Sequence, residues 1–327
     1  MSEAVILAGG RWQIGARRFA RPSRIIVAGE VSEVLPALHS AEIAARAGSW
    51  VVGFVSYQAA PGLDPRLRVP VSGVPDVLPL VWFGVFDGYE DPEPATGGVA
   101  LSGWSAGMSE TEHESRVDSI RASIAEGDTY QVNLTFPMEA TLSGNPETLF
   151  SAMLRAQPQC YGAFFDLGER QVLSVSPELF IRQQGRSVTT QPMKGTAPRG
   201  RWTGEDMEMK ERLTRSEKER AGNLMIVDML RNDLGRVARP GTVRVPELIQ
   251  AERHPTVWQL TSTIEAELEP GIGLAELFTA LFPCGSVTGA PKISTMGIIS
   301  ELEVTSRGVY CGAIGYLAPG GDSSEFS

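Results

Sequence analysis

The stretch Arg170–Gly200, RQVLSVSPELFIRQQGRSVTTQPMKGTAPRG, decides the fold. It holds two runs that alternate apolar and polar residues, joined by a polar turn of sequence QQGR. Alternation with a period of two is typical of β-strands, so the stretch predicts an antiparallel hairpin. Such a hairpin would place Glu178 and Lys194 on neighbouring strands.

Lys194 lies in a segment rich in glycine and proline, and two interpretations of it are open. The segment alone favours a solvated lysine at a strand end, because lysine is rarely buried. The alternative is a lysine in a confined site, where desolvation or a neighbouring cation lowers its pKa and frees the amine as a nucleophile. Glu178 would then be its carboxylate partner.

The rest of the chain mixes helices with short strands, which favours an α+β fold. A helix is predicted between an N-cap at Ser109 and a closing glycine at Gly127. A single long helix is predicted over residues 205–237, with Gly222 in its middle, where glycine costs roughly 1 kcal/mol against alanine. Residues 273–303 predict a helix, a glycine-rich loop and a second helix that begins near Pro291.

Composition divides the chain into two parts and bounds its partners. Residues 1–105 are predicted to be a β-rich N-terminal part of the same fold, and residues 106–327 its more regular remainder. The net charge of −10 and pI of about 5.0 argue against nucleic acid as the main partner. The longest apolar run is about half of a membrane span, so no membrane is expected. Three scattered cysteines fit a reducing cytoplasm better than a disulfide scaffold.

The stretch Phe282–Lys292, FPCGSVTGAPK, is the clearest candidate for an anion site. Its glycines let backbone amides approach a ligand, and the helix that follows directs free N–H groups to the same place. Lys292 would add positive charge there, or would be solvated. The alternative for the whole stretch is a tight loop that merely precedes a helix.

Six motifs occur together along the chain: SPELFI, PMKGT, NLMIVDMLRNDLGRV, TVWQLTSTIEAEL, LFPCGSVTGAPK and GVYCGAIGYL. Their order and spacing resemble those of the chorismate-utilising enzymes from about residue 110 to the end, and VSYQAAPGLDP and LPLVWFGVFD extend the resemblance into the N-terminal third. The resemblance implies a large α+β domain with packed antiparallel sheets and helices outside, in which residues 106–327 form the chorismate-binding catalytic region. It also implies a Mg²⁺-dependent reaction on chorismate.

Two positions separate the reactions of this family. Members that hydrate chorismate carry a water-activating lysine where this chain has Gln131, which cannot act as a base, so the resemblance favours amine transfer. Anthranilate synthases carry alanine at the position of Lys194, whereas component I of aminodeoxychorismate synthase carries lysine. The resemblance therefore implies formation of 4-amino-4-deoxychorismate toward p-aminobenzoate and folate. Ammonia would come from a glutamine amidotransferase partner.

The resemblance also implies roles for individual residues. Lys194 would attack C2 of chorismate, with Glu178 as its carboxylate partner and Gln259 hydrogen-bonded to the departing 4-hydroxyl. The residues implied to bind substrate, mainly its two carboxylates, are Gln131, Gly195, Thr196, Gly285, Ser286, Thr288, Gly289 and Tyr316.

Two departures from the family pattern keep alternatives open. A Mg²⁺-binding glutamate of the family corresponds to Gly222 here, and Glu219, one helical turn earlier, would be the substitute ligand. Relatives also continue past Ser327 through a strand and a helix with a second Mg²⁺-binding glutamate, so a C-terminal segment is expected to be missing. The alternatives are a truncated or altered, non-catalytic relative that binds the amidotransferase or the ligand, and an enzyme of the anthranilate or isochorismate synthase type.

Overall fold

The computed structural model describes residues 3–71 and 78–327. Its centre is a large sheet in which every paired strand is antiparallel. Followed from one hydrogen-bonded partner to the next, its strands are β13 (Met193–Pro198), β15 (Val257–Glu267), β12 (Ser187–Gln191), β11 (Leu179–Gln184), β18 (Ser323–Phe326), β17 (Ala313–Leu317), β4 (Trp50–Val55), β5 (Val81–Phe86) and β3 (Arg24–Ala28), with β14 (Arg244–Arg253) also paired to β15.

A smaller antiparallel sheet packs on one face of the large sheet. Its strands, in order, are β10 (Gln171–Ser176), β9 (Tyr161–Asp166), β1 (Ala4–Ala8) and β2 (Arg17–Ala20). Strands such as β1 and β5 are almost entirely apolar because both of their faces are covered. The layer between the sheets is built from aromatic and aliphatic side chains, among them Val5, Phe19, Phe54, Trp82, Phe165 and Tyr316.

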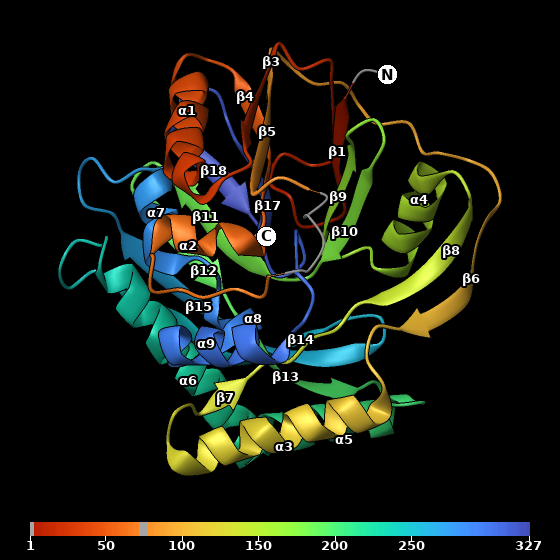
Figure 1. Cartoon of the computed structure of the whole chain (residues 1–327), viewed down its shortest axis with the longest axis vertical. Coiled ribbons are helices and arrows are strands. Elements are labelled where there is room, and N and C mark those ends of the chain that lie inside the picture. Colours follow the sequence, from red (N-terminus) through yellow and green to blue (C-terminus); the bar gives the residue numbers. More distant parts are fainter. Residues whose placement is uncertain (1–2, 72–77) are drawn as a thin grey trace.

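Helices cover the outer faces of both sheets, which gives four layers in Figure 1. Three helices bury Leu38, Leu230 and Phe278 against the large sheet, and Phe150 of a fourth packs on the small sheet. These helices are α1 (Val34–Arg46), α6 (Glu217–Gly235), α7 (Leu274–Leu281) and α4 (Pro146–Ala156). The predicted α+β class, with packed antiparallel sheets and helices outside, is confirmed.

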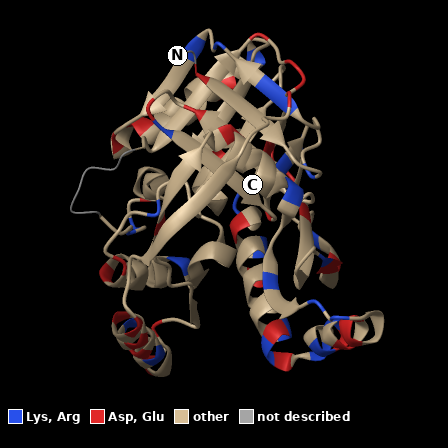
Figure 2. Cartoon of the chain, turned by 90° about the vertical axis from the view of Figure 1, so that its right-hand side faces the viewer, with Lys and Arg blue, Asp and Glu red and all other residues tan. Residues whose placement is uncertain are grey.

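The remaining elements are short or lie at one end of the molecule. They are η1 (Val31–Glu33), η2 (Tyr57–Ala59), α2 (Ala60–Leu63), the pair β6 (Val99–Ala106) and β8 (Met138–Gly144), α3 (Glu110–Glu126), the pair β7 (Gln131–Val132) and β16 (Gly289–Ala290), α5 (Thr203–Arg215), α8 (Gly285–Thr288) and α9 (Lys292–Leu302). Charged residues gather on the helices at the lower end of Figure 2 and are sparse on the central strands.

The predicted helix between Ser109 and Gly127 is confirmed as α3. The Ser109 hydroxyl accepts a hydrogen bond from the amide of Glu112, and Gly127 ends the helix with a left-handed φ of 86°. The predicted single helix over 205–237 is wrong. The chain breaks at Ser216 into α5 and α6, because the Ser216 hydroxyl accepts a hydrogen bond from the amide of Glu219 and so caps a new helix.

The predicted hairpin is confirmed for β11 and β12, but Lys194 does not lie on a neighbour of β11. After Pro192 the chain continues as β13 along the same edge of β15 that β12 occupies. The placement of Lys194 on the strand next to that of Glu178 is therefore wrong. The two residues still come close, because Glu178 directly precedes β11 and its carboxyl lies near the backbone amide of Met193, the residue before Lys194.

Within residues 3–71 and 78–327, no helix combines the length and the apolar character that crossing a membrane requires.

Candidate active site

Lys194 is half-buried between β13 and helix α6, so it is not a solvated surface lysine. A Cβ atom added at Gly222 of α6 would lie 3.8 Å from its Cγ, which shows that this glycine faces the lysine. Burial lowers the pKa of Lys194 below the usual lysine value, while the carboxylates of Glu178 and Glu219 act in the opposite direction. Of the two interpretations that the sequence left open, the geometry matches the lysine in a confined site.

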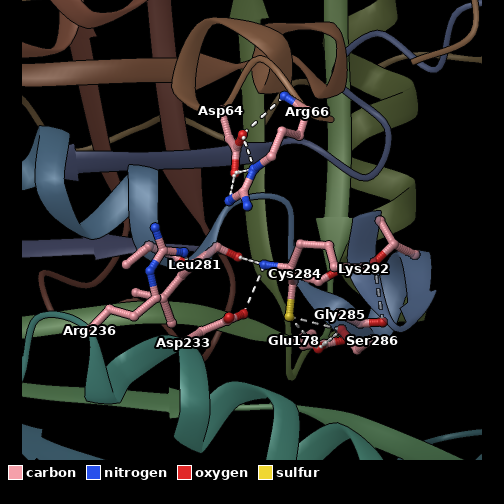
Figure 3. Close-up of polar contacts among 12 residues, drawn as sticks. Asp64, Arg66, Glu178, Asp233, Arg236, Leu281, Cys284, Gly285, Ser286 and Lys292 are labelled. Carbon is pink, nitrogen blue, oxygen red and sulfur yellow. Dashed lines mark hydrogen bonds and ion pairs between the residues drawn. The ribbon is translucent and has the colours of Figure 1, made fainter. Parts of the chain in front are cut away.

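The Glu178 carboxyl lies next to the turn of α8, where Figure 3 shows it with Cys284 and Ser286. It accepts a short hydrogen bond from the Ser286 hydroxyl. Burial raises the pKa of Glu178 to about 7, against the opposing effects of this hydrogen bond, of the Met193 amide and of Lys194. A carboxyl with a pKa near neutrality can both donate and accept a proton at physiological pH.

Residues 285–288 form one short helical turn, α8, rather than the predicted loop. A Cβ at Gly285 would overlap the side chain of Met229, and a Cβ at Gly289 would lie 2.0 Å from the carbonyl oxygen of Gln131. Gly289 is therefore required by its positive φ of 143° and its close approach to the backbone of β7, whereas at Gly285 the flexible end of Met229 would have to move. The Thr288 hydroxyl is buried and donates to the carbonyl of Cys284 at 3.1 Å. This hydrogen bond stabilises the α8 turn.

Thr196 and Gln259 lie beside Lys194 on paired strands. They are Cα partners across β13 and β15, and the Thr196 hydroxyl donates to Gln259 Oε1 at 2.8 Å. Gly195, between Lys194 and Thr196, has a φ of 102°, and a Cβ there would lie 3.2 Å from Glu219 Oε2. The structure therefore brings Lys194, Gly195, Thr196, Gln259 and Glu219 to one place.

Gln131 lies on β7, where it pairs with Ala290 of β16 in front of helix α9. Its side-chain amide nitrogen is buried and, within the described residues, makes no hydrogen bond. Buried donors nearly always have a partner, so this group is available to a ligand.

Tyr316 does not lie near Lys194 and the residues around it. Its side chain is buried between the two sheets, on the face of the large sheet opposite to α6, and its hydroxyl donates to Glu325 Oε2 at 3.2 Å. Glu325 is also paired with Arg182 at 2.5 Å. The aromatic ring belongs to the core, so the structure does not support a contact between Tyr316 and a ligand held at Lys194.

Lys292 does not contribute a free charge to the predicted anion site. Its Nζ lies 2.8 Å from a carboxylate oxygen of Asp233 and donates to the carbonyl of Leu281, also at 2.8 Å (Figure 3). These contacts lie in the wall of a separate cavity of about 540 Å³. The lysine joins α9 to α6 and α7, which is a structural role.

Two asparagines of the site were missed by the sequence analysis. Lys194 Nζ donates to Asn133 Oδ1 at 3.1 Å, and Asn223 Nδ2 donates to the backbone carbonyl of Lys194 at 3.2 Å. Asn133 follows Gln131 by two positions, so strand alternation could have placed the two on one face. Asn223 directly follows Gly222, which faces Lys194.

The residues at this site offer few ligands to the Mg²⁺ ion that the family resemblance implies. No group of three His, Cys, Asp or Glu side chains with metal-binding geometry occurs in the described part of the chain. Near Lys194, Glu219 is the carboxylate on α6, and Gly222 supplies no ligand. Magnesium is usually held by one or two carboxylates with near-ideal octahedral geometry. No chemical step is therefore assigned to a metal here.

Two packed antiparallel sheets with helices outside, and a confined lysine beside a carboxyl of raised pKa, define an enzyme-like site at the edge of the large sheet. Residues 16–327 match the chorismate binding enzyme family, and the chain belongs to this family. The resemblance inferred from the motifs is thus confirmed.

Named relatives carry two activities. The chain is 44% identical to aminodeoxychorismate synthase component 1 of Klebsiella aerogenes, over 70% of this chain and 54% of the relative. It is 41% identical to anthranilate synthase component 1 of Streptomyces coelicolor, over 67% of this chain and 43% of the relative. The chain therefore spans about half the length of these curated relatives.

The fold is shared with anthranilate synthase component I from Streptococcus pneumoniae TIGR4. The TM-score is 0.79 at 24% sequence identity, covering 98% of this chain and 80% of that one. At this identity the likeness concerns the fold alone.

Proposed function

We propose that this chain acts as component I of an aminodeoxychorismate synthase, which converts chorismate and ammonia to 4-amino-4-deoxychorismate. The observation that carries the proposal is the half-buried Lys194 amine, whose pKa is lowered by burial, beside a Glu178 carboxyl whose pKa is about 7. A lysine with a lowered pKa loses its proton more readily and then is a nucleophile, and a carboxyl that titrates near neutral pH can move protons for it.

The proposed reaction has two substitutions. In the first, the Lys194 amine forms a bond to C2 of chorismate, both ring double bonds shift (C1=C2 to C1=C6, and C5=C6 to C4=C5), and the C4–O bond breaks as the hydroxyl is protonated and leaves as water. In the second, ammonia bonds to C4, both double bonds return to their first positions, and the C2–N bond to Lys194 breaks. Glu178 is assigned the proton transfers, and the Gln259 amide, already held by Thr196, is assigned a hydrogen bond to the departing hydroxyl.

Substrate recognition in this proposal uses the turn at α8 and the buried amide of Gln131. Gly195, Thr196, Gly285, Ser286 and Gly289 line or shape the same region. The Gln131 amide nitrogen, which has no hydrogen-bond partner within the described residues, is assigned to an oxygen of chorismate. Ammonia is proposed to come from a glutamine amidotransferase subunit, in keeping with relatives that are named component 1.

A product assay tests the proposal. Purified chain is incubated with chorismate, ammonium and magnesium, and products are separated and identified by mass. We expect 4-amino-4-deoxychorismate from the wild type and none from Lys194→Ala. Formation of isochorismate would assign the chain to the hydrating enzymes despite Gln131, and formation of anthranilate would assign it to the anthranilate synthases.

The second candidate function is a non-catalytic relative that only binds chorismate or the amidotransferase. Gly222 favours it, because Glu219 is then the carboxylate of α6 near Lys194 and position 222 adds no second one. This candidate predicts chorismate binding by calorimetry without turnover. It also predicts that Gly222→Glu stays inactive.

A further inference from the structure

Asn133 lies directly after β7 and links Lys194 to the α8 turn. Its Oδ1 accepts from Lys194 Nζ at 3.1 Å, and its Nδ2 donates to the carbonyl of Ser286 at 2.7 Å. The second contact fixes the orientation of the amide. If the amide were flipped, its NH₂ group would face the lysine, placing two donors together, and its oxygen would face the Ser286 carbonyl.

The backbone around Asn133 is held as firmly as its side chain. Its amide donates to the carbonyl of Thr288 at 2.9 Å, and its carbonyl accepts from Arg307 Nη2 at 2.8 Å. Arg307 also donates to the carbonyl of Val287 at 2.9 Å, so one guanidinium joins the chain at Asn133 to the α8 turn. Asn133 therefore cannot move independently of that turn.

A buried ion pair fixes this guanidinium in turn. Arg307 and Glu303 lie 2.7 Å apart, and their side chains are 1% and 2% exposed. Glu303 also accepts from the backbone amide of Thr135 at 2.8 Å. A buried ion pair with its remaining hydrogen bonds satisfied has one arrangement, which makes it a rigid support.

We propose that Asn133 is a positioning residue that holds the Lys194 amine in register with the Ser286–Glu178 pair, and that Glu303 and Arg307 hold Asn133 in place. The contacts form one chain from the amine through Asn133 to the backbone of Ser286, whose hydroxyl meets Glu178. An amine that donates one N–H to Asn133 directs its lone pair away from that residue. The catalytic meaning of this placement rests on the proposed function, whereas the placement itself does not.

Competitive acetylation of lysines tests the placement without substrate. The sequence contains four lysines, Lys194, Lys210, Lys218 and Lys292, so peptide mass spectrometry resolves each of them. Folded wild type and variants are treated with acetic anhydride at pH 7, and each rate is divided by that of Lys210. Asn133→Ala frees the amine and should raise the Lys194 rate several-fold. Asn133→Asp adds a carboxylate next to the ammonium and should lower it about tenfold.

Opposite signs for the two variants distinguish positioning from a general structural role, which would move both rates upward together. Unchanged Lys194 rates, or changes of the same sign, would overturn the proposal. Thermal unfolding checks that each variant is folded. If Asn133→Asp does not fold, Asn133→Ala decides with Lys292 as the internal reference, because that lysine is largely buried in an ion pair with Asp233. A Lys194 rate that rises while the Lys292 rate stays unchanged supports the placement. A rise of both rates, or an unchanged or lowered Lys194 rate, contradicts it.

Turnover supplies the second readout. With chorismate and ammonium, Asn133→Ala should lower kcat at least tenfold while KM for chorismate changes less than twofold, because the residue contacts the amine and not the substrate. A wild type without turnover would defeat the proposed function and leave the acetylation result standing. A wild type with turnover and normal acetylation in both variants would defeat the role of Asn133 alone.

Discussion

Lys194 and Lys292 both lie in segments rich in glycine and proline, yet the structure gives them different surroundings. Lys292 faces the carboxylate of Asp233 and the carbonyl of Leu281, both at 2.8 Å. Lys194 Nζ instead donates a hydrogen bond to the side-chain oxygen Oδ1 of Asn133 at 3.1 Å. The nearby carboxylates of Glu178 and Glu219 form no ion pair with Lys194 in the described residues. The first arrangement holds the lysine in a fixed ion pair, whereas the second holds an amine whose pKa is lowered by burial. The partners of a lysine, rather than its sequence context, separate the two roles.

The largest effect is expected for Lys194→Ala. If Lys194 is the nucleophile, the substitution should lower formation of 4-amino-4-deoxychorismate by roughly a thousandfold or more. The free energy of unfolding should change by less than about 1 kcal/mol, because the side chain is half-buried and makes one side-chain hydrogen bond. Product assays and urea unfolding measure the two quantities. Retained activity would show that Lys194 is not the nucleophile.

Lys292→Ala should show the reverse pattern. Removal of one partner leaves the largely buried Asp233 carboxylate unpaired, so we expect a loss of about 2 to 3 kcal/mol in the free energy of unfolding. Urea unfolding measures it, and Asp233→Asn with Lys292→Met is the matched control that removes both charges. A variant as stable as wild type would show that this ion pair does not support the fold.

Glu178→Gln tests the raised pKa near Lys194. The folded state of wild type keeps its proton up to about pH 7, whereas an ordinary glutamate loses it near 4.5, so the folded state binds more protons between these values. The free energy of unfolding contributed by Glu178 therefore falls as pH rises through this range. Unfolding measured from pH 4.5 to 7.5 should show a flatter pH dependence for the variant. Parallel curves for both proteins would contradict the assignment.

Substitution of Gly222 should produce the smallest change in stability and a qualitative change in metal binding. Gly222→Ala should stabilise the protein by up to about 1 kcal/mol, because the added Cβ lies 3.8 Å from the nearest side-chain atom, Lys194 Cγ. Gly222→Glu adds a carboxylate near Glu219 and should increase binding of Mn²⁺, used as a probe for Mg²⁺, with Gly222→Ala as the control. Equal Mn²⁺ binding by wild type and both variants would show that this position does not govern metal affinity.

Local patterns predicted the elements whose stabilising contacts lie close in sequence. The capping box of α3 and the β11–β12 turn involve residues a few positions apart. The break between α5 and α6 was also predictable, since Ser216 and Glu219 carry the spacing of a helix N-terminus. The position of β13 was not, because β15, which pairs with both β12 and β13, is more than fifty residues away.

The residues of the candidate site also differ in how far the sequence predicted them. Motifs placed Lys194, Glu178, Thr196, Gln259 and the α8 turn in one region, and the structure brings them together. Tyr316 was misplaced because alternate side chains of β17 point to opposite faces of the large sheet. The face that each side chain takes is set by the register of β17 with β18, which lies outside the motif. Asn133 was missed because its partners, Lys194 and Ser286, lie 61 and 153 residues away.

The most direct test of the proposed chemistry is to trap the lysine adduct. The folded chain is incubated with chorismate in the absence of ammonia, then digested and mapped by mass spectrometry. Chorismate that has lost water should be found on the peptide that contains Lys194, and Lys194→Ala should show no adduct. An unmodified Lys194 peptide from a chain that forms 4-amino-4-deoxychorismate, or an adduct on Lys292 instead, would contradict the assignment of Lys194 as the nucleophile.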